Sequence, residues 1–195
     1  DRSAAMSANG RSVSILGVTG SIGRSTLDVI EQLRLQGVDI QIEAITAGRN
    51  IGALADACRR LRPRFAAVAD EAHLSEARAA LAGMDIEVGA GAGALEEAGA
   101  RPADWVMSAI VGAAGLTGTW LALQAGKTVA VANKETMVVA GPLVMDLARE
   151  KNACILPVDS EHSAIFQAAK SGTPREIERV VLTASGGPFR GKKRA

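Results

Sequence analysis

Short apolar segments alternate with helical segments along most of this 195-residue chain, and this alternation restricts the fold more than any other feature. The segments that we interpret as strands are 13–16, 40–46, 65–69, 86–88, 105–109, 128–132 and 154–158. Helices are expected in most of the gaps. The first, 22–35, has Ile22, Leu27 and Ile30 near helical spacing and ends before Gly37. Such alternation predicts an α/β fold with a Rossmann-like, doubly wound parallel sheet.

The composition fits such a sheet and limits the classes of partner. Hydrophobic residues make up 48% of the chain and aromatic residues only 3%, so the core must consist mainly of small aliphatic side chains. These suit parallel strands that are covered by helices on both faces. Lys and Arg number 22 against 21 Asp and Glu, so no overall positive field favours nucleic acid. A bound anion must therefore be held by local groups.

Two further features bear on location. Cys58 and Cys154 have neither a CxxC motif nor zinc-site spacing, which predicts reduced thiols in a cytoplasmic protein. The segment 105–126 has no charged residue and is long enough to cross a bilayer. Its hydroxyl side chains and glycines favour a buried strand, a turn and a packed helix instead. We therefore expect no membrane association.

A glycine-rich turn, Gly17-Val-Thr-Gly-Ser-Ile-Gly23, follows the first predicted strand directly and opens the first helix. In this context glycine lets the backbone approach a pyrophosphate, and the free N–H groups of the helix N-terminus attract it. Thr19 and Ser21 can add hydroxyl donors. The spacing GxxGxxG differs from the common GxGxxG, so a plain tight turn is the alternative.

The end of the second predicted strand indicates which dinucleotide would bind. NAD-specific sites usually place an acidic residue here, because its carboxylate accepts from the ribose 2′-hydroxyl. This chain has Gly48, Arg49 and Asn50 instead, and a guanidinium suits a 2′-phosphate. We therefore predict NADPH rather than NADH. The alternative is that Arg49 only covers the surface.

Two carboxylates, Asp159 and Glu161, follow the last strand of the predicted sheet. On extended backbone, residues two apart point to the same side and can share one cation. Oxygen ligands favour Mg²⁺ or Mn²⁺ over zinc. The alternative, which the spacing alone favours, is that Asp159 or Ser160 caps the next helix and Glu161 lies in its first turn.

Polar residues follow two other strands. Lys134 can hold a phosphate or polarise an oxygen and Asn133 can touch a nicotinamide, although both are also ordinary residues at a helix start. The turn Ser185-Gly-Gly187 can wrap a phosphate with backbone N–H groups or simply face solvent. We interpret His73 and His162 as structural, because neither has a partner at ligand spacing.

Six segments together, in this order, resemble the 1-deoxy-D-xylulose 5-phosphate reductoisomerase family of the non-mevalonate isoprenoid pathway. They are Gly17-Val-Thr-Gly-Ser-Ile-Gly-Arg-Ser-Thr-Leu-Asp28, Ala47-Gly-Arg-Asn50, Ala109-Ile-Val-Gly-Ala-Ala-Gly115, Ala132-Asn-Lys-Glu135, Leu156-Pro-Val-Asp-Ser-Glu-His162 and Ser185-Gly-Gly-Pro-Phe189. The resemblance implies conversion of 1-deoxy-D-xylulose 5-phosphate to 2-C-methyl-D-erythritol 4-phosphate. NADPH would be the hydride donor, and Mg²⁺ or Mn²⁺ would chelate the substrate.

The resemblance also implies a role for each matching residue. The implied NADPH contacts are Thr19, Gly20, Ser21, Ile22, Gly48, Arg49, Asn50, Asn133 and Glu135. Asp159 and Glu161 would bind the metal and, with Lys134, take the catalytic roles. The implied contacts to the phosphorylated sugar substrate are Lys134, Ser160, Glu161 and Ser185. Where relatives often carry Lys, Arg49 supplies the same charge.

The expected organisation has three parts. Residues 1–12 would be a tag remnant or a disordered N-terminus, 13–158 the NADPH-binding Rossmann-like domain, and 159–195 the beginning of a truncated α+β catalytic domain. That last part should hold one helix, a strand at 180–184 and a glycine loop. We expect 89–100, which is rich in Gly and Ala, to be a loop with a short helix.

The resemblance implies that family members continue further, with a mobile loop over the substrate and a C-terminal helical domain. That part would supply a third metal carboxylate, a His and further phosphate contacts. We therefore expect this chain by itself to bind NADPH without turnover. By the same resemblance we expect a homodimer.

Two other functions fit parts of the sequence. An NADP-dependent semialdehyde dehydrogenase also uses a strand and a threonine–glycine turn. It needs a nucleophilic cysteine, however, for which neither Cys58 nor Cys154 is well placed. A non-catalytic nucleotide-binding module would use the Rossmann part alone, and would leave Asp159 and Glu161 without a role.

Overall fold

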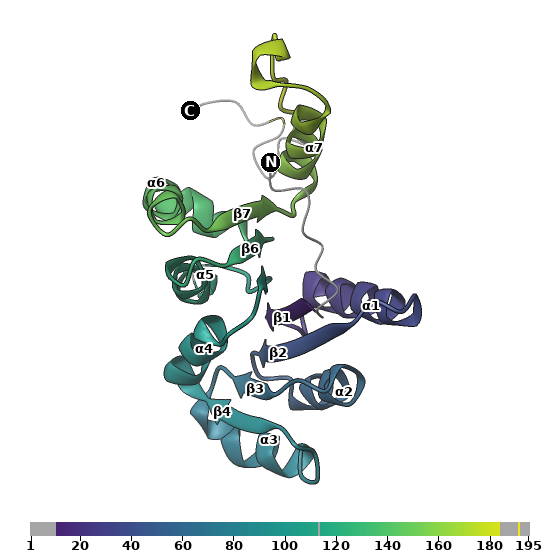
Figure 1. The fold of residues 1–195 in the computed structure, drawn as a ribbon. Coiled ribbons are helices and arrows are strands. Elements are labelled where there is room, and N and C mark those ends of the chain that lie inside the picture. Colours follow the sequence, from purple (N-terminus) through teal and green to yellow (C-terminus); the bar gives the residue numbers. More distant parts are fainter. Residues whose placement is uncertain (1–10, 113, 184–190, 192–195) are drawn as a thin grey trace. The chain divides into compact units, whose positions relative to one another are not determined.

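The computed structural model describes residues 11–112, 114–183 and 191 (Figure 1). Contacts between residues divide the chain into two units, with the division between Leu156 and Pro157. Each unit is described by itself below.

The first unit is built on a seven-stranded parallel sheet. Its strands are β1 (Arg11–Leu16), β2 (Ile40–Ala47), β3 (Phe65–Val68), β4 (Glu87–Ala90), β5 (Trp105–Ser108), β6 (Thr128–Val131) and β7 (Cys154–Pro157). They lie in the order β4-β3-β2-β1-β5-β6-β7. The chain therefore builds outward from β1 in one direction, returns, and continues from β5 in the other direction. This order confirms the predicted doubly wound sheet, and the strand ends differ from the predicted ones by one or two residues.

Helices cover both faces of this sheet (Figure 1). One face carries α1 (Ser21–Leu35), α2 (Ile51–Leu61) and α3 (Leu74–Ala80), with the short 3-10 helix η1 (Glu71–His73) before α3. The other face carries α4 (Gly91–Ala100), α5 (Gly115–Gln124) and α6 (Lys134–Glu150). The connection from β4 to β5 passes through α4, and there the chain changes from one face to the other.

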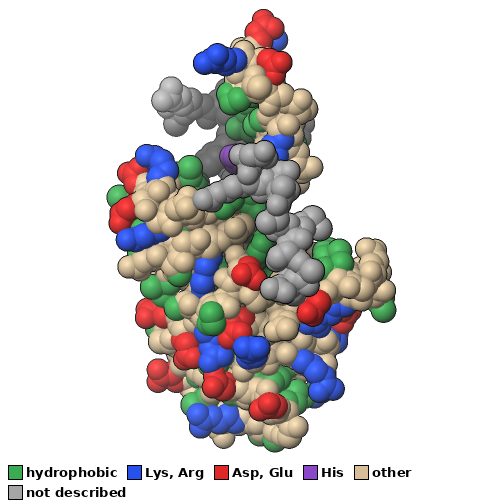
Figure 2. Space-filling view, viewed as in Figure 1, with side chains coloured by type: hydrophobic (Ala, Val, Ile, Leu, Met, Phe, Trp, Pro, Cys, Tyr) green, Lys and Arg blue, Asp and Glu red, His purple; other side chains and the backbone are tan. Residues whose placement is uncertain are grey.

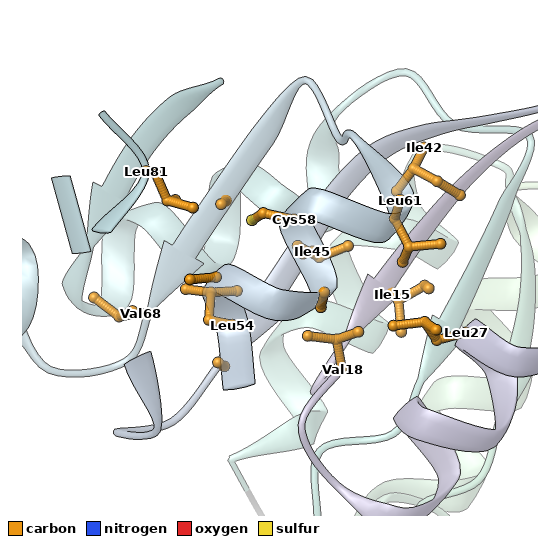
Figure 3. Close-up of a cluster of buried hydrophobic side chains, with 14 of the residues drawn as sticks. Ile15, Val18, Leu27, Ile42, Ile45, Leu54, Cys58, Leu61, Val68 and Leu81 are labelled. Carbon is orange, nitrogen blue, oxygen red and sulfur yellow. The ribbon is translucent and has the colours of Figure 1, made fainter. Parts of the chain in front are cut away.

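Each face has its own aliphatic core. Ile15, Ile45 and Leu54 are fully buried between the sheet and α1 and α2, and Figure 3 shows them in one cluster of buried hydrophobic side chains. Val106 and Leu123 are fully buried on the opposite face. Complete burial of one such side chain contributes about 1.5–3 kcal/mol, so these two layers hold the strand ends in place.

Our expectation for residues 89–100 is right about a helix but wrong about the loop. β4 extends through Ala90, and α4 is a regular helix of ten residues despite its three glycines. Ala94 and Ala98 pack against the sheet, and a Cβ on Gly99 would lie 2.9 Å from the Gly118 carbonyl oxygen of α5. Small residues are therefore needed where the two helices meet, and this tertiary packing outweighs the weak helix propensity of glycine.

The uncharged segment 105–126 forms β5, a turn and α5, as predicted. Among the described residues, no helix has the length and apolar character needed to cross a membrane. On the visible face of the first unit, Lys and Arg side chains are interspersed with Asp and Glu (Figure 2).

The second unit contains α7 (Ser160–Ala168) and the short helices η2 (Ala169–Ser171) and η3 (Pro174–Glu176). The predicted strand at 180–184 is wrong for residues 180–183, which form no strand; residue 184 lies outside the described part. A strand must pair its N–H and C=O groups with a neighbouring strand. Among the described residues of this unit, residues 180–183 have no such neighbouring strand. Val180, Val181 and Leu182 are accordingly exposed.

Candidate functional site

The sheet reverses its strand order between β1 and β5, and the carboxyl ends of these two strands form the candidate cofactor edge. The turn after β1 lies directly against the turn after β5. A Cβ on Gly17 would be 3.0 Å from the Ala109 carbonyl and from the Ile110 nitrogen. Gly17 also has φ +89°, a conformation that other residues rarely adopt. Only glycine therefore fits where the two turns meet.

The glycine turn is held by the end of β2. The Gly17 N–H donates to Thr46 Oγ1 at 2.9 Å, and the Val18 N–H donates to the Thr46 carbonyl at 2.8 Å. A Cβ on Gly23 would overlap the Gly17 carbonyl oxygen and would lie 2.6 Å from the Val18 backbone. The first turn of α1 is thus pressed onto the loop that precedes it.

The N-terminus of α1 suits an anion. Gly20 is the N-cap, no side chain among the described residues caps the helix, and the first turn has no acidic residue. Its backbone N–H groups and positive dipole end therefore have no competing side-chain acceptor. Thr19 is half-buried, while Gly20, Ser21 and Ile22 are exposed. This arrangement fits the pyrophosphate of a dinucleotide.

Gly48, Arg49 and Asn50 lie at the end of β2 and are all exposed. Asn50 Oδ1 accepts from the Ala53 N–H at 2.9 Å and caps α2. The Arg49 side chain is 82% exposed, and its Nε lies 3.9 Å from Asp70 Oδ2. A pair this long and this exposed contributes little, so the guanidinium can turn toward a phosphate at small cost.

The residues after β6 differ sharply in exposure. Lys134 and Glu135, in the first turn of α6, are exposed, whereas Asn133 is only 3% exposed. Asn133 Nδ2 donates to the carbonyls of Ile110 and Gly112, both at 2.6 Å. Its Oδ1 caps α6 by accepting from the Thr136 N–H at 3.3 Å. The structure thus commits this side chain to the protein's own backbone.

In the second unit, the extended geometry that we considered for Asp159 and Glu161 is wrong. α7 begins at Ser160, and Asp159 is its N-cap: Oδ2 accepts from the His162 N–H at 3.2 Å. The carboxylate accepts from one of the N–H groups that the helix itself cannot pair, which starts the helix there and places Glu161 in its first turn.

Asp159 Oδ2 also lies 2.6 Å from His162 Nδ1, so His162 does have a carboxylate partner, which our sequence interpretation missed. In the part of the chain that the structure describes, no three His, Cys, Asp or Glu residues form a metal site. Ser185 lies outside the described residues.

The cysteines are not placed for nucleophilic chemistry at this edge. Cys58 lies toward the far end of α2, which runs away from the carboxyl end of β2. It is fully buried, and burial raises the pKa of its thiol to about 12. A thiol that stays protonated at neutral pH is a poor nucleophile. Cys154 is exposed at the start of β7, the end opposite the carboxyl edge.

Comparison with known proteins identifies the family. The sequence matches the family model of 1-deoxy-D-xylulose 5-phosphate reductoisomerase over residues 13–141. The chain belongs to this family. The model of the reductoisomerase C-terminal domain matches residues 155–195. The resemblance drawn from the six sequence segments is therefore confirmed.

Curated reductoisomerases show how much of the protein is represented. The reductoisomerase of Rhodopseudomonas palustris (strain BisB18) is 55% identical over 190 residues, which are 97% of this chain and 46% of that protein. The one from Caulobacter vibrioides is 51% identical over 180 residues, which are 92% of this chain and 44% of that protein. The chain thus spans about half the length of the curated relatives that it matches.

Solved reductoisomerases share the fold. The Zymomonas mobilis enzyme in complex with NADPH is 47% identical, with a TM-score of 0.86 over 96% of this chain and 49% of that chain. A reductoisomerase in complex with NADPH, fosmidomycin and magnesium is 38% identical, with a TM-score of 0.76 over 80% of this chain and 38% of that chain.

Two sets of hydrogen bonds that stabilise the candidate cofactor edge were not predicted from the sequence. Thr46 holds the glycine turn, and Ser108 Oγ lies 2.7 Å from Thr119 Oγ1, which donates to the Gly115 carbonyl at 2.9 Å. Ser108 and Thr119 are fully buried and link the end of β5 to the start of α5. The available signal was a hydroxyl residue at the end of an apolar strand, where burial demands a hydrogen-bond partner.

Proposed function

We propose that this chain is the NADPH-binding part of an enzyme that rearranges and reduces 1-deoxy-D-xylulose 5-phosphate to 2-C-methyl-D-erythritol 4-phosphate. The observation that carries the proposal is the glycine turn at the strand-order reversal. It opens a helix without a side-chain cap, and an exposed arginine follows the adjacent strand. These features are what a phosphorylated dinucleotide needs, and the solved relatives described above hold NADPH.

Different residues are proposed to contact different parts of NADPH. Thr19, Gly20, Ser21 and Ile22 would meet the pyrophosphate at the start of α1, where backbone N–H groups lack side-chain partners. Gly48, Arg49 and Asn50 would surround the adenosine 2′-phosphate. Asn133 and Glu135 would lie toward the nicotinamide. NADPH supplies the hydride when bound, and the protein's task is to orient it.

Asp159 and Glu161 are proposed to hold Mg²⁺ or Mn²⁺. Mg²⁺ usually takes one or two protein carboxylates and completes its shell with water and substrate oxygens, so two carboxylates two residues apart fit it chemically. When bound, the metal would stabilise negative charge on the substrate. Lys134, Ser160 and Ser185 would hold the phosphorylated sugar, with the exposed Lys134 ammonium as a phosphate partner. Solved relatives bind magnesium and fosmidomycin.

The test is a titration of the 195-residue chain with NADPH and with NADH, followed by a turnover assay with 1-deoxy-D-xylulose 5-phosphate and Mn²⁺. We expect NADPH to bind more tightly than NADH and not to be oxidised. Failure to bind NADPH would overturn the proposal. Oxidation that requires both substrate and metal would support the reaction, but would contradict the expectation that these residues alone lack activity.

The rival semialdehyde dehydrogenase loses support from the structure, because Cys58 is buried in the hydrophobic core and the pKa of its thiol is raised. A homodimer and a cytoplasmic location are further proposals. The homodimer is carried by the family resemblance, and light scattering of the purified protein tests it. The location is carried by two cysteines without a disulfide.

A further inference from the structure

Asn133 has no amide hydrogen left for a ligand. A side-chain amide has two N–H donors, and here both are donated to backbone carbonyls of the loop between β5 and α5. The oxygen of the same amide caps α6. With 3% of its surface exposed, Asn133 lies beneath that loop rather than on the open cofactor edge.

Two distant residues, Gly17 and Asn133, contact the loop between β5 and α5. On one side, the glycine turn after β1 approaches Ala109 and Ile110 so closely that only glycine fits at position 17. On the other side, a Cβ on Gly115 would lie only 2.5 Å from Asn133 Nδ2. Two parts of the chain that are far from this loop in sequence, the glycine turn and Asn133, therefore contact it at the point where the strand order reverses.

The hydrogen bonds from Asn133 determine the direction in which the loop's backbone groups point. A trans peptide is planar, so its C=O and the following N–H point in opposite directions. Because the Ile110 carbonyl points at Asn133, the N–H of Val111 points away from it. Val111 as a residue is 81% exposed, so it lies on the outer surface of the loop.

We propose that Asn133 is a positioning residue, which acts on the bound dinucleotide through the 110–112 loop and not through its own amide. It orients the Val111 N–H and side chain toward the crevice between β1 and β5, where a dinucleotide crosses the sheet. The inference rests on the proposed NADPH binding. It differs from the direct contact that the family resemblance assigns to Asn133.

The substitution Asn133→Asp separates the possible roles. Aspartate has nearly the same shape and caps a helix as well as asparagine does, so α6 keeps its cap. It cannot donate, however, and it places negative charge against two carbonyl oxygens. We expect the Kd for NADPH to rise about tenfold to a hundredfold, as for the loss of two buried hydrogen bonds.

The decisive readout is the backbone order of residues 110–112 by ¹⁵N NMR relaxation, in the chain without cofactor. Positioning predicts that Asn133→Asp lowers this order and also weakens NADPH. Weaker NADPH with unchanged order would make Asn133 a direct ligand, and no change in either would leave it only a helix cap. Lower order with unchanged affinity would show that the loop does not serve the cofactor. Each of these three outcomes overturns the inference.

Two further variants complete the design. Asn152→Asp makes the same change at an exposed asparagine and should alter neither quantity. If Asn133→Asp does not fold, Asn133→Ser keeps a good N-cap, removes the amide donors and adds no charge, and the same outcomes apply. Failure of the unsubstituted chain to bind NADPH would overturn the proposed function itself, and is recognised before any variant is made.

Discussion

Single residues in this chain acquire their chemistry from burial and from their backbone neighbours. Arg49 and Cys58 lie only nine positions apart, yet the Arg49 side chain is 82% exposed and Cys58 is completely buried. Because it is exposed, the Arg49 guanidinium can bind a phosphate, whereas burial keeps the Cys58 thiol protonated. The residue types alone allow a functional role for each. Their environments favour ligand binding for Arg49 and a packing role for Cys58.

Replacing Arg49 tests the selectivity for NADPH. Arg49→Met should raise the Kd for NADPH about tenfold to a hundredfold, because a charge-assisted bond to the 2′-phosphate is lost. The Kd for NADH should stay the same, since NADH lacks that phosphate. Fluorescence titration measures both constants. Arg49→Lys should retain most of the affinity and Arg59→Met, at another exposed arginine, all of it. Equal losses for the two cofactors would contradict the assignment.

Cys58 should respond to pH in a defined direction. Its thiol ionises near 9 when unfolded but at a pKa of about 12 in the fold, so the folded state holds the proton more tightly. The thiol's contribution to stability is therefore fully present below pH 9 and is lost as the pH rises toward 12. The difference in unfolding free energy between the unsubstituted chain and Cys58→Ala should shrink over this range in denaturant titrations. A constant difference would show that the thiol is not desolvated.

Alkylation gives an independent check on the two cysteines. At pH 8, iodoacetamide should add one group to the folded chain, at the exposed Cys154, and two groups after denaturation. Mass spectrometry counts the additions. NADPH binding should survive the treatment, whereas a cysteine-dependent dehydrogenase would lose its activity.

At the scale of elements, the connection between β1 and α1 shows how identical residues serve different purposes. Gly17 is required by its φ of +89° and by the turn after β5, while Gly23 is required because α1 presses onto the preceding loop. Gly20 meets neither demand: a Cβ there would lie 3.6 Å from the Gly17 carbonyl oxygen, an ordinary contact. The same motif thus contains two packing glycines and one N-cap.

The same substitution at two of these glycines should have unequal effects. Gly23→Ser should destabilise the chain by about 1–3 kcal/mol through overpacking against the turn. Gly20→Ser, at an N-cap where serine is favoured, should change stability by about 0.5 kcal/mol or less. Urea unfolding measures both values. Similar losses at the two positions would mean that the close approach of α1 to the turn is not what Gly23 serves.

At the scale of the whole chain, the proposed cofactor residues and the proposed metal residues lie in two units that differ in burial. The first unit has two buried aliphatic layers, whereas none of the described residues from 157 to 183 is buried. The residues proposed to bind NADPH all lie in the first unit, and Asp159 and Glu161 lie in the second. We therefore expect the two binding activities to respond separately to substitution.

Asp159→Ser tests that separation. Serine still caps α7, but the carboxylate is gone, so Mn²⁺ should bind at least about tenfold more weakly, as expected for loss of a charged ligand. The Kd for NADPH should not change. Calorimetry with MnCl₂ and with NADPH gives both values, and Asp146→Ser, at an exposed acid on α6, is the control. Unaltered Mn²⁺ binding would favour a nucleotide-binding module without a metal role for Asp159.

The sequence by itself determined the doubly wound sheet, the places of its strands, the glycine turn and the family. These features follow from periodicity and spacing within short stretches, which a linear pattern records directly. The full length of the helix at Gly91–Ala100 and the absence of a strand at 180–183 were not predicted, because each depends on whether a distant neighbour is present to pack or pair with.

Only the tertiary structure decided what the edge residues do. Asn133 reaches carbonyls 21 and 23 positions earlier in the chain, and Gly17 meets a turn that begins at Ala109. Asp159 caps a helix, which is the alternative that its spacing to Glu161 favoured over an extended pair. Local sequence specifies which groups are available. The folding of distant segments against one another specifies which of those groups are already used and which remain for a ligand.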